Sequence, residues 1–257
     1  MIPFNTLLKK EITRFLKVAG QSLVTPLVTS FLYLLIFGIG IGEQISTGDS
    51  VAYLVFLIPG LIMMGVLNNS FMNPSFSLMI SKIYGDIEDL KTSPLTPTII
   101  VWAMTTAATI RGLIVALVIF LVGQLFSILK FQQFIFPSHI FLLIFILTFA
   151  GMTFGLIGFS VGIFARSFEK LNVISQFIIL PLTYLGGVFF SLNNLHPFWQ
   201  FCSKLNPIFY YINAARYSFL NISDTSIIKT VLITLLFFIL SYIIAIVSAK
   251  KASYKHL

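Results

Sequence analysis

Arg111 is the one charged side chain that lies deep inside a long apolar stretch of this sequence. If the apolar block 99–129 forms a helix, Arg111 lies about 18 Å from its start, near the middle of a bilayer of roughly 30 Å. A charge at that depth costs about 2.5 to 3.5 kcal/mol on insertion scales, so we expect it to face a helix bundle or a cavity. Two interpretations stay open: a structural arginine held by hydrogen bonds, or a residue of a substrate or gating pathway.

The partners available to Arg111 are amides and backbone carbonyls, because no apolar block has an Asp or Glu at its centre. The side-chain candidates are Asn68, Asn69, Asn73 and Gln176. The missing carboxylates also argue against a proton-coupled or sodium-coupled secondary transporter, because the relays of such proteins usually place carboxylates inside the membrane.

Motifs for nucleotide, metal or covalent chemistry are missing from the sequence. No G-x-x-x-x-G-K-[ST] phosphate-binding loop occurs, so we expect any ATP to be bound by another chain. The single cysteine, Cys202, and the three scattered histidines have no metal-ligand spacing. We therefore predict no catalytic residue, no metal site and no cofactor.

A short charged stretch at 82–92 follows the second apolar block and is closed by Pro94 and Pro97. This pattern predicts a short helix that ends before the prolines, within a polar stretch from 77 to 98. Its candidate functional residues are Lys82, Asp86, Ile87, Glu88, Asp89, Leu90 and Lys91.

A second polar segment, 187–222, mixes asparagines and prolines with many aromatic residues. Irregular backbone near a membrane is tolerated only where protein or a water-filled cavity surrounds it, so we predict short helices that re-enter the outer leaflet. The residues of interest in and just before this segment are Tyr184, Gly186, Gly187, Trp199, Asn206, Pro207 and Arg216.

The elements that must position these residues are membrane helices. Of the 257 residues, 58% are hydrophobic and 9% are charged, and the mean hydropathy is +1.00. Apolar blocks of about twenty residues match the thickness of a bilayer, so we predict an all-α integral membrane protein that forms a single domain over 1–257. The six predicted spans are 22–42, 52–76, 99–129, 138–164, 172–190 and 227–249.

Residues 1–20 place apolar side chains at helical spacing, with Lys10, Arg14 and Lys17 on the other side. We predict an amphipathic helix at the membrane interface, and a packed helix is the alternative. In span four, Gly151, Gly155, Gly158 and Gly162 would allow close helix approach, either within the subunit or between subunits.

Basic residues lie at the ends of the apolar blocks and not in a stripe, so the net charge of +8 does not indicate a nucleic-acid surface. Eleven of them would face one side and four the other, which places both termini in the cytoplasm. The eleven are Lys9, Lys10, Arg14, Lys17, Lys82, Lys91, Arg166, Lys170, Lys250, Lys251 and Lys255, against Lys130, Lys204, Arg216 and Lys229.

The order of these parts resembles the type-2 ABC exporter permeases, the membrane subunits of drug-resistance, polysaccharide-export and YadH-like systems. The likeness covers nearly the whole chain. Its most specific pieces are PGLIMMGVLNNSF at 59–71, IEDLKTSPL at 87–95, Arg111 with Gly112, PLTYLGGVFFSL at 181–192, FW at 198–199 and KLNPIFYYINAARYSFL at 204–220.

This resemblance implies a permease homodimer in the inner membrane of a bacterium, docked on separate subunits that bind ATP and Mg²⁺. It also implies that 82–92 is the coupling helix and that a hydrophobic or amphipathic substrate is exported, such as a drug, a lipid or a lipid-linked glycan. A secondary transporter and a membrane scaffold without transport are the alternatives.

Overall fold

A computed structural model describes residues 2–42, 44, 51–85 and 95–254, and every regular element within these ranges is helical. The elements are α1 (Ile2–Lys17), α2 (Ala19–Tyr33), η1 (Leu34–Gly40), α3 (Tyr53–Tyr84), α5 (Pro97–Phe131), α6 (Ile140–Phe164), α7 (Phe168–Ile174), η2 (Ser175–Ile179), α8 (Leu180–Leu185), η3 (Leu192–Asn194), α9 (Pro197–Leu205), α10 (Pro207–Leu220) and α11 (Ile227–Tyr254). The prediction of an all-α architecture is confirmed for the described residues.

Five helical stretches are long and apolar enough to cross a membrane. They are Ser22–Gly40, Tyr53–Tyr84, Pro97–Phe131, Ile140–Phe164 and Ile227–Lys251. The sixth predicted span, 172–190, corresponds instead to α7, η2 and α8 in succession, which together end at Leu185. The number of six spans therefore stays a prediction.

Helix α3 is longer than the second predicted span, which ended at residue 76. It continues to Tyr84 and ends at Gly85, whose φ of 81° is the left-handed conformation that favours glycine. The polar residues after 76 stay helical because other helices satisfy them: the Ser77 hydroxyl donates to Glu11 at 2.8 Å, and Lys82 bonds to carbonyls of α6. The polar stretch predicted to begin at 77 is thus a helical continuation.

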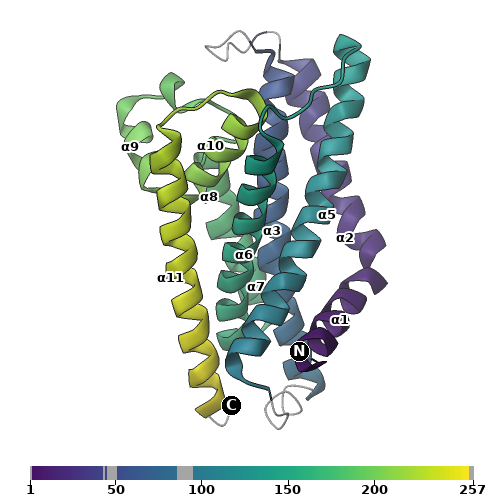
Figure 1. The fold of residues 1–257 in the computed structure, drawn as a ribbon. Coiled ribbons are helices and arrows are strands. Elements are labelled where there is room, and N and C mark those ends of the chain that lie inside the picture. Colours follow the sequence, from purple (N-terminus) through teal and green to yellow (C-terminus); the bar gives the residue numbers. More distant parts are fainter. Residues whose placement is uncertain (1, 43, 45–50, 86–94, 255–257) are drawn as a thin grey trace.

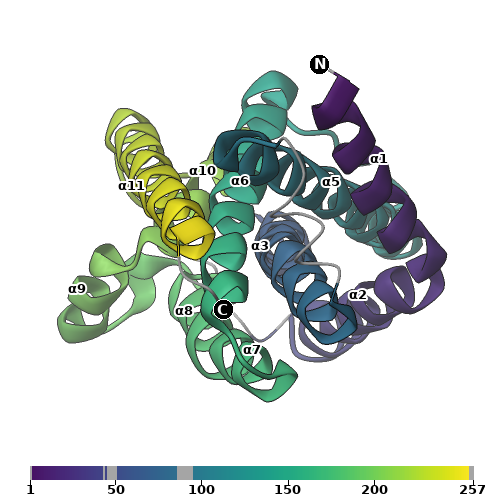
Figure 2. The same ribbon diagram turned by 90° about the horizontal axis from the view of Figure 1, so that it is seen from below.

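Helix α3 lies at the centre of the bundle, with α5 and α6 against it (Figure 2). Gly158 of α6 faces the backbone of α3, and a Cβ atom there would lie 2.2 Å from the carbonyl oxygen of Phe71. Ser75 also donates a hydrogen bond of 2.9 Å to the Gly158 carbonyl. The glycines of span four therefore serve packing within the subunit, the first of the two alternatives.

The other helices surround this centre. Figure 1 shows α11 along one flank and α1 and α2 along the other, with α8, α9 and α10 gathered near one end. The start of α1 and the end of α11 lie at the opposite end, close to the end of α3 and the start of α5 (Figure 1). The start of α1 and the end of α11 thus lie at the same end of the bundle, and the cytoplasmic position of both termini stays a prediction.

Helix α1 differs from the prediction in which face it buries. Leu7, Glu11 and Phe15 are 5%, 3% and 1% exposed, so a carboxylate lies in the middle of the buried face. Arg14 also turns toward the bundle, where it meets Glu11 and Asn73, and not toward lipid headgroups. The prediction that Arg14 lies on the face of α1 opposite its apolar side chains, away from the bundle, was wrong. Arg14 can face the bundle because pairing with Glu11 reduces the cost of burying its charge.

Candidate functional site: a cavity lined by two arginines

A cavity of about 550 Å³ opens between α1, α2, α3 and α5. Its apolar wall comes mainly from α3, with side chains such as Leu61, Met64 and Met72. Its polar residues come from all four helices, and they are Arg14, Ser22, Thr25, Thr29, Ser30, Tyr33, Asn68, Asn69 and Arg111. The cavity thus combines apolar surface with two guanidinium groups.

Arg111 extends from α5 toward two asparagines of α3. Its Nη1 donates to Asn73 Oδ1 and its Nη2 to Asn69 Oδ1, both at 3.4 Å. The Nε atom is buried and has no hydrogen-bond partner among the described residues. The partners are the amides expected from the sequence, but the bonds are long for contacts to a charged donor.

Arg14 approaches the same asparagine from α1. Its Nη2 donates to the backbone oxygen of Asn73 at 3.1 Å and to Oδ1 at 3.3 Å, and it forms an ion pair with Glu11 at 3.0 Å. Asn73 therefore joins the two guanidinium groups of Arg14 and Arg111. Sequence reasoning missed Glu11, although its position three residues before Arg14 on one helix was the signal.

The other two pathway candidates are placed apart from Arg111. Asn68 lines the cavity, but its Oδ1 accepts a hydrogen bond of 3.0 Å from Ser175 of η2. Gln176 is exposed on η2 and is not part of the cavity wall. The structure thus brings Asn69 to Arg111 and leaves Gln176 outside.

An aromatic cluster lies beside the polar wall of the cavity. The hydroxyls of Tyr33 and Tyr184 are 2.9 Å apart, which links α2 to α8. Phe189 packs against both rings, with centroid distances of 5.3 and 5.4 Å. Tyr184, predicted as part of the outer segment, thus contributes to the contact between α2 and the segment that follows α8.

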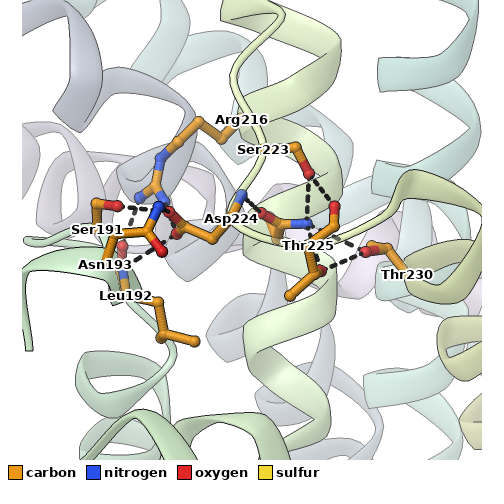
Figure 3. Close-up of polar contacts among 10 residues, drawn as sticks. Ser191, Leu192, Asn193, Arg216, Ser223, Asp224, Thr225 and Thr230 are labelled. Carbon is orange, nitrogen blue, oxygen red and sulfur yellow. Dashed lines mark hydrogen bonds and ion pairs between the residues drawn. The ribbon is translucent and has the colours of Figure 1, made fainter. Parts of the chain in front are cut away.

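A second polar cluster lies near the end of α10 and the start of α11 and contains a buried ion pair (Figure 3). Arg216 Nη1 is 3.5 Å from Asp224 Oδ2, and the two side chains are 1% and 3% exposed. The guanidinium also lies 3.9 Å from the centre of the Phe56 ring and donates to the Gly187 carbonyl. Arg216 is therefore held on several sides.

Asp224 connects this ion pair to the loop before η3 and to α10. It accepts hydrogen bonds from the Ser191 hydroxyl and from the backbone nitrogen of Leu192, and its own backbone nitrogen donates to Asn213 at 2.8 Å (Figure 3). Asn213 in turn donates to Ser223, Thr225 and Thr230. Sequence reasoning missed Asp224, although it is the only acidic residue after Glu169.

The other candidate residues in and just before 187–222 have local structural roles or are exposed. Gly187 has a φ of 88°, and a Cβ atom on Gly186 would lie 2.8 Å from Ile212. Asn206 caps α10 by accepting from the backbone nitrogen of Ile208 at 3.0 Å, and Pro207 is the first residue of that helix. Trp199 of α9 is 48% exposed.

Lys82 does not lie in a separate charged helix, as the sequence had predicted. It belongs to the last turn of α3, and its Nζ donates to the carbonyls of Gly162 at 3.1 Å and Ala165 at 2.9 Å at the end of α6. A lysine here compensates the negative end of the helix dipole. The other predicted coupling residues lie outside the described residues: Asp86, Ile87, Glu88, Asp89, Leu90 and Lys91.

Comparison with known proteins finds relatives that match nearly the whole chain. A family model described as "ABC-2 type transporter" matches residues 3–220. The "Inner membrane transport permease YadH" of Escherichia coli (strain K12) is 35% identical over 243 residues, which cover 95% of this chain and 93% of that protein. The protein of the same name from Shigella flexneri matches with the same identity and coverage.

Proposed function

The chain belongs to the ABC-2 type transporter family, and from this membership we propose that it is the membrane permease subunit of an ATP-driven exporter. The exporter would move a hydrophobic or amphipathic molecule, such as a drug, a lipid or a lipid-linked glycan, out across the inner membrane of a bacterium. The observation that carries the proposal beyond family membership is the cavity of about 550 Å³ between the membrane helices, with both apolar surface and guanidinium groups.

The energy source in this proposal is a separate ABC ATP-binding subunit. The sequence has no phosphate-binding loop of its own, so ATP and Mg²⁺ are bound by that partner. Two permease chains and two ATP-binding subunits form the transporter. Closure of the ATP-binding subunits shifts the permease from an inward-facing to an outward-facing state, because it binds one of the two states better.

The contact with the ATP-binding subunit is made by 82–92 in this proposal. In the sequence this segment joins α3 to α5, and both of these helices line the cavity, so a movement imposed on the segment would be passed to the cavity wall. The cytoplasmic position of this segment follows from the charge asymmetry of the sequence.

The experiment is co-expression with the ABC ATP-binding subunit encoded next to the permease gene. We expect the two proteins to co-purify and ATP hydrolysis to depend on both, in membrane vesicles. A variant of the ATP-binding subunit that lacks its phosphate-loop lysine is the matched control, and it should bind the permease without hydrolysing ATP. If no ATP-binding subunit co-purifies, or if the permease leaves its ATP hydrolysis unchanged, the proposal is wrong.

Arg111→Ala tests whether the cavity belongs to the transport route. We expect this variant to be expressed and to co-purify with the ATP-binding subunit, but to lose export. Unchanged export would favour the interpretation of Arg111 as a structural residue.

A further inference from the structure

The cavity contains more positive charge than the described residues around it can balance. Arg14 and Arg111 both line it, whereas the nearby described carboxylate is Glu11. Glu11 uses both of its oxygens, one for Arg14 and one for Ser77 at 2.8 Å. Among the described residues, the Arg111 guanidinium therefore contacts only the amide oxygens of Asn69 and Asn73.

Arg216 is a buried arginine whose charge is balanced by a carboxylate, so it can be compared with Arg111. Arg216 has a buried carboxylate at 3.5 Å, an aromatic ring under its guanidinium and a backbone carbonyl. Arg111 has two amide oxygens at 3.4 Å and no carboxylate partner among the described residues. A charge without a counter-charge inside a membrane protein is costly, so an anion at Arg111 would be stabilised.

We propose that this cavity binds the anionic headgroup of an amphiphile, with Arg111 as the main contact and Arg14 beside it. The planar guanidinium donates two parallel hydrogen bonds, which match a phosphate or carboxylate group. The apolar wall of α3 takes the hydrophobic part of the same molecule. This inference rests on the proposed function in one respect, because it identifies the transported molecule as an anionic amphiphile.

The composition of the wall favours an amphiphile over a free anion. Most of the α3 side chains that line the cavity are apolar, among them Leu61, Met64, Met72, Phe76 and Ile80. A small anion would leave this surface facing water, whereas an acyl or prenyl chain would cover it, at a gain of about 25 cal/mol for each Å² of apolar surface removed from water. A cavity of about 550 Å³ is also larger than a single phosphate group needs.

The test measures lipid binding to the purified permease without any ATP-binding subunit. The protein is placed in phosphatidylcholine nanodiscs that contain increasing fractions of phosphatidylglycerol, and retained lipids are counted by native mass spectrometry. Phosphatidylcholine also carries a phosphate but has no net charge, so the comparison separates the effect of net charge from that of the phosphate group. We expect the wild type to retain phosphatidylglycerol selectively and Arg111→Gln to lose about tenfold in apparent affinity.

Two further variants control for folding and for general charge effects. Arg111→Lys keeps the charge but not the two-pronged donor, so we expect an intermediate affinity. Arg166 is exposed and lies outside the cavity, so Arg166→Gln should bind like the wild type. Each variant is used only if it elutes as a single species, and Arg111→Lys provides the comparison if Arg111→Gln does not fold.

The proposal is overturned if Arg111→Gln, or Arg111→Lys in its place, retains phosphatidylglycerol as well as the wild type does. It is also overturned if millimolar inorganic phosphate displaces the lipid, because the ligand would then be a free anion. Neither result depends on ATP or on the partner subunit. Failure of lipid binding would therefore leave the permease assignment intact, and failure of co-purification would leave the binding result intact.

Discussion

Two arginines of this protein lie within the helical bundle with very different partners. Arg216 is paired with the carboxylate of Asp224, and the pair is joined to Ser191 and Leu192. Arg111 relies on Asn69 and Asn73 alone among the described residues. The first arginine therefore stabilises the fold around α10, and the second can still bind a ligand.

Asp224→Asn should strongly destabilise the fold. Removing one member of a buried ion pair leaves the other charge uncompensated, at a cost of about 3 to 5 kcal/mol. Asn193→Ala is the matched control, because Asn193 is exposed and donates to the same carboxylate at 3.4 Å, so its loss should change stability by less than about 0.5 kcal/mol. Thermal unfolding in detergent measures both, and equal midpoints would contradict a structural role for the ion pair.

At the scale of single residues, the sequence predicts which charged side chain is buried better than it predicts the partners of the buried charges. The depth of Arg111 and its amide acceptors follow from its position in an apolar block without carboxylates. The Ser77 contact of Glu11 and the partners of Asp224 could not be assigned, because they depend on how separate segments pack and not on the spacing within one helix. That both are isolated acidic residues in a membrane protein was nevertheless a signal that they are buried and paired.

Helices α3 and α6 pack closely because glycines of α6 face the backbone of α3. Gly158→Ala would place a Cβ atom 2.2 Å from the Phe71 carbonyl oxygen, which is backbone and cannot rotate away. We expect a loss of about 1 to 3 kcal/mol and a lower unfolding temperature, because the helices must separate. The control is Gly20→Ala in α2, where a Cβ atom would meet no atom within 4 Å. An unchanged unfolding temperature for Gly158→Ala would show that the two helices can separate at little cost.

Five long helices could be predicted from hydropathy alone, because each has an uninterrupted apolar stretch. The position at which α3 ends could not be predicted from hydropathy, because the last turns of α3 are polar and are stabilised by Glu11 of α1 and by the end of α6. The segment 168–185 is likewise less regular than a hydropathy plot indicates. It contains the wider turns of η2 between α7 and α8.

At the scale of the whole molecule, the topology across the membrane stays a prediction. The start of α1 and the end of α11 lie at the same end of the bundle (Figure 1), and eleven of the fifteen basic residues outside Arg111 were assigned to that side. Reporter fusions after Leu257 and near Asp49 should therefore report cytoplasm and periplasm, respectively. A periplasmic reporter after Leu257 would overturn the topology, and with it the contact between 82–92 and a cytoplasmic partner.

Docking of the ATP-binding subunit gives the last prediction. If Ile87 and Leu90 insert into the partner while Glu88 and Asp89 contact its rim, a small interface depends on each of these contacts. Replacing both acidic residues with lysine should weaken co-purification and reduce coupled ATP hydrolysis, because like charges would then face each other. The unfolding temperature of the isolated permease should stay the same, since these side chains are expected to lie in water. If co-purification and ATP hydrolysis are unchanged in the double variant, 82–92 only connects α3 to α5. Another segment would then couple ATP hydrolysis to the membrane helices.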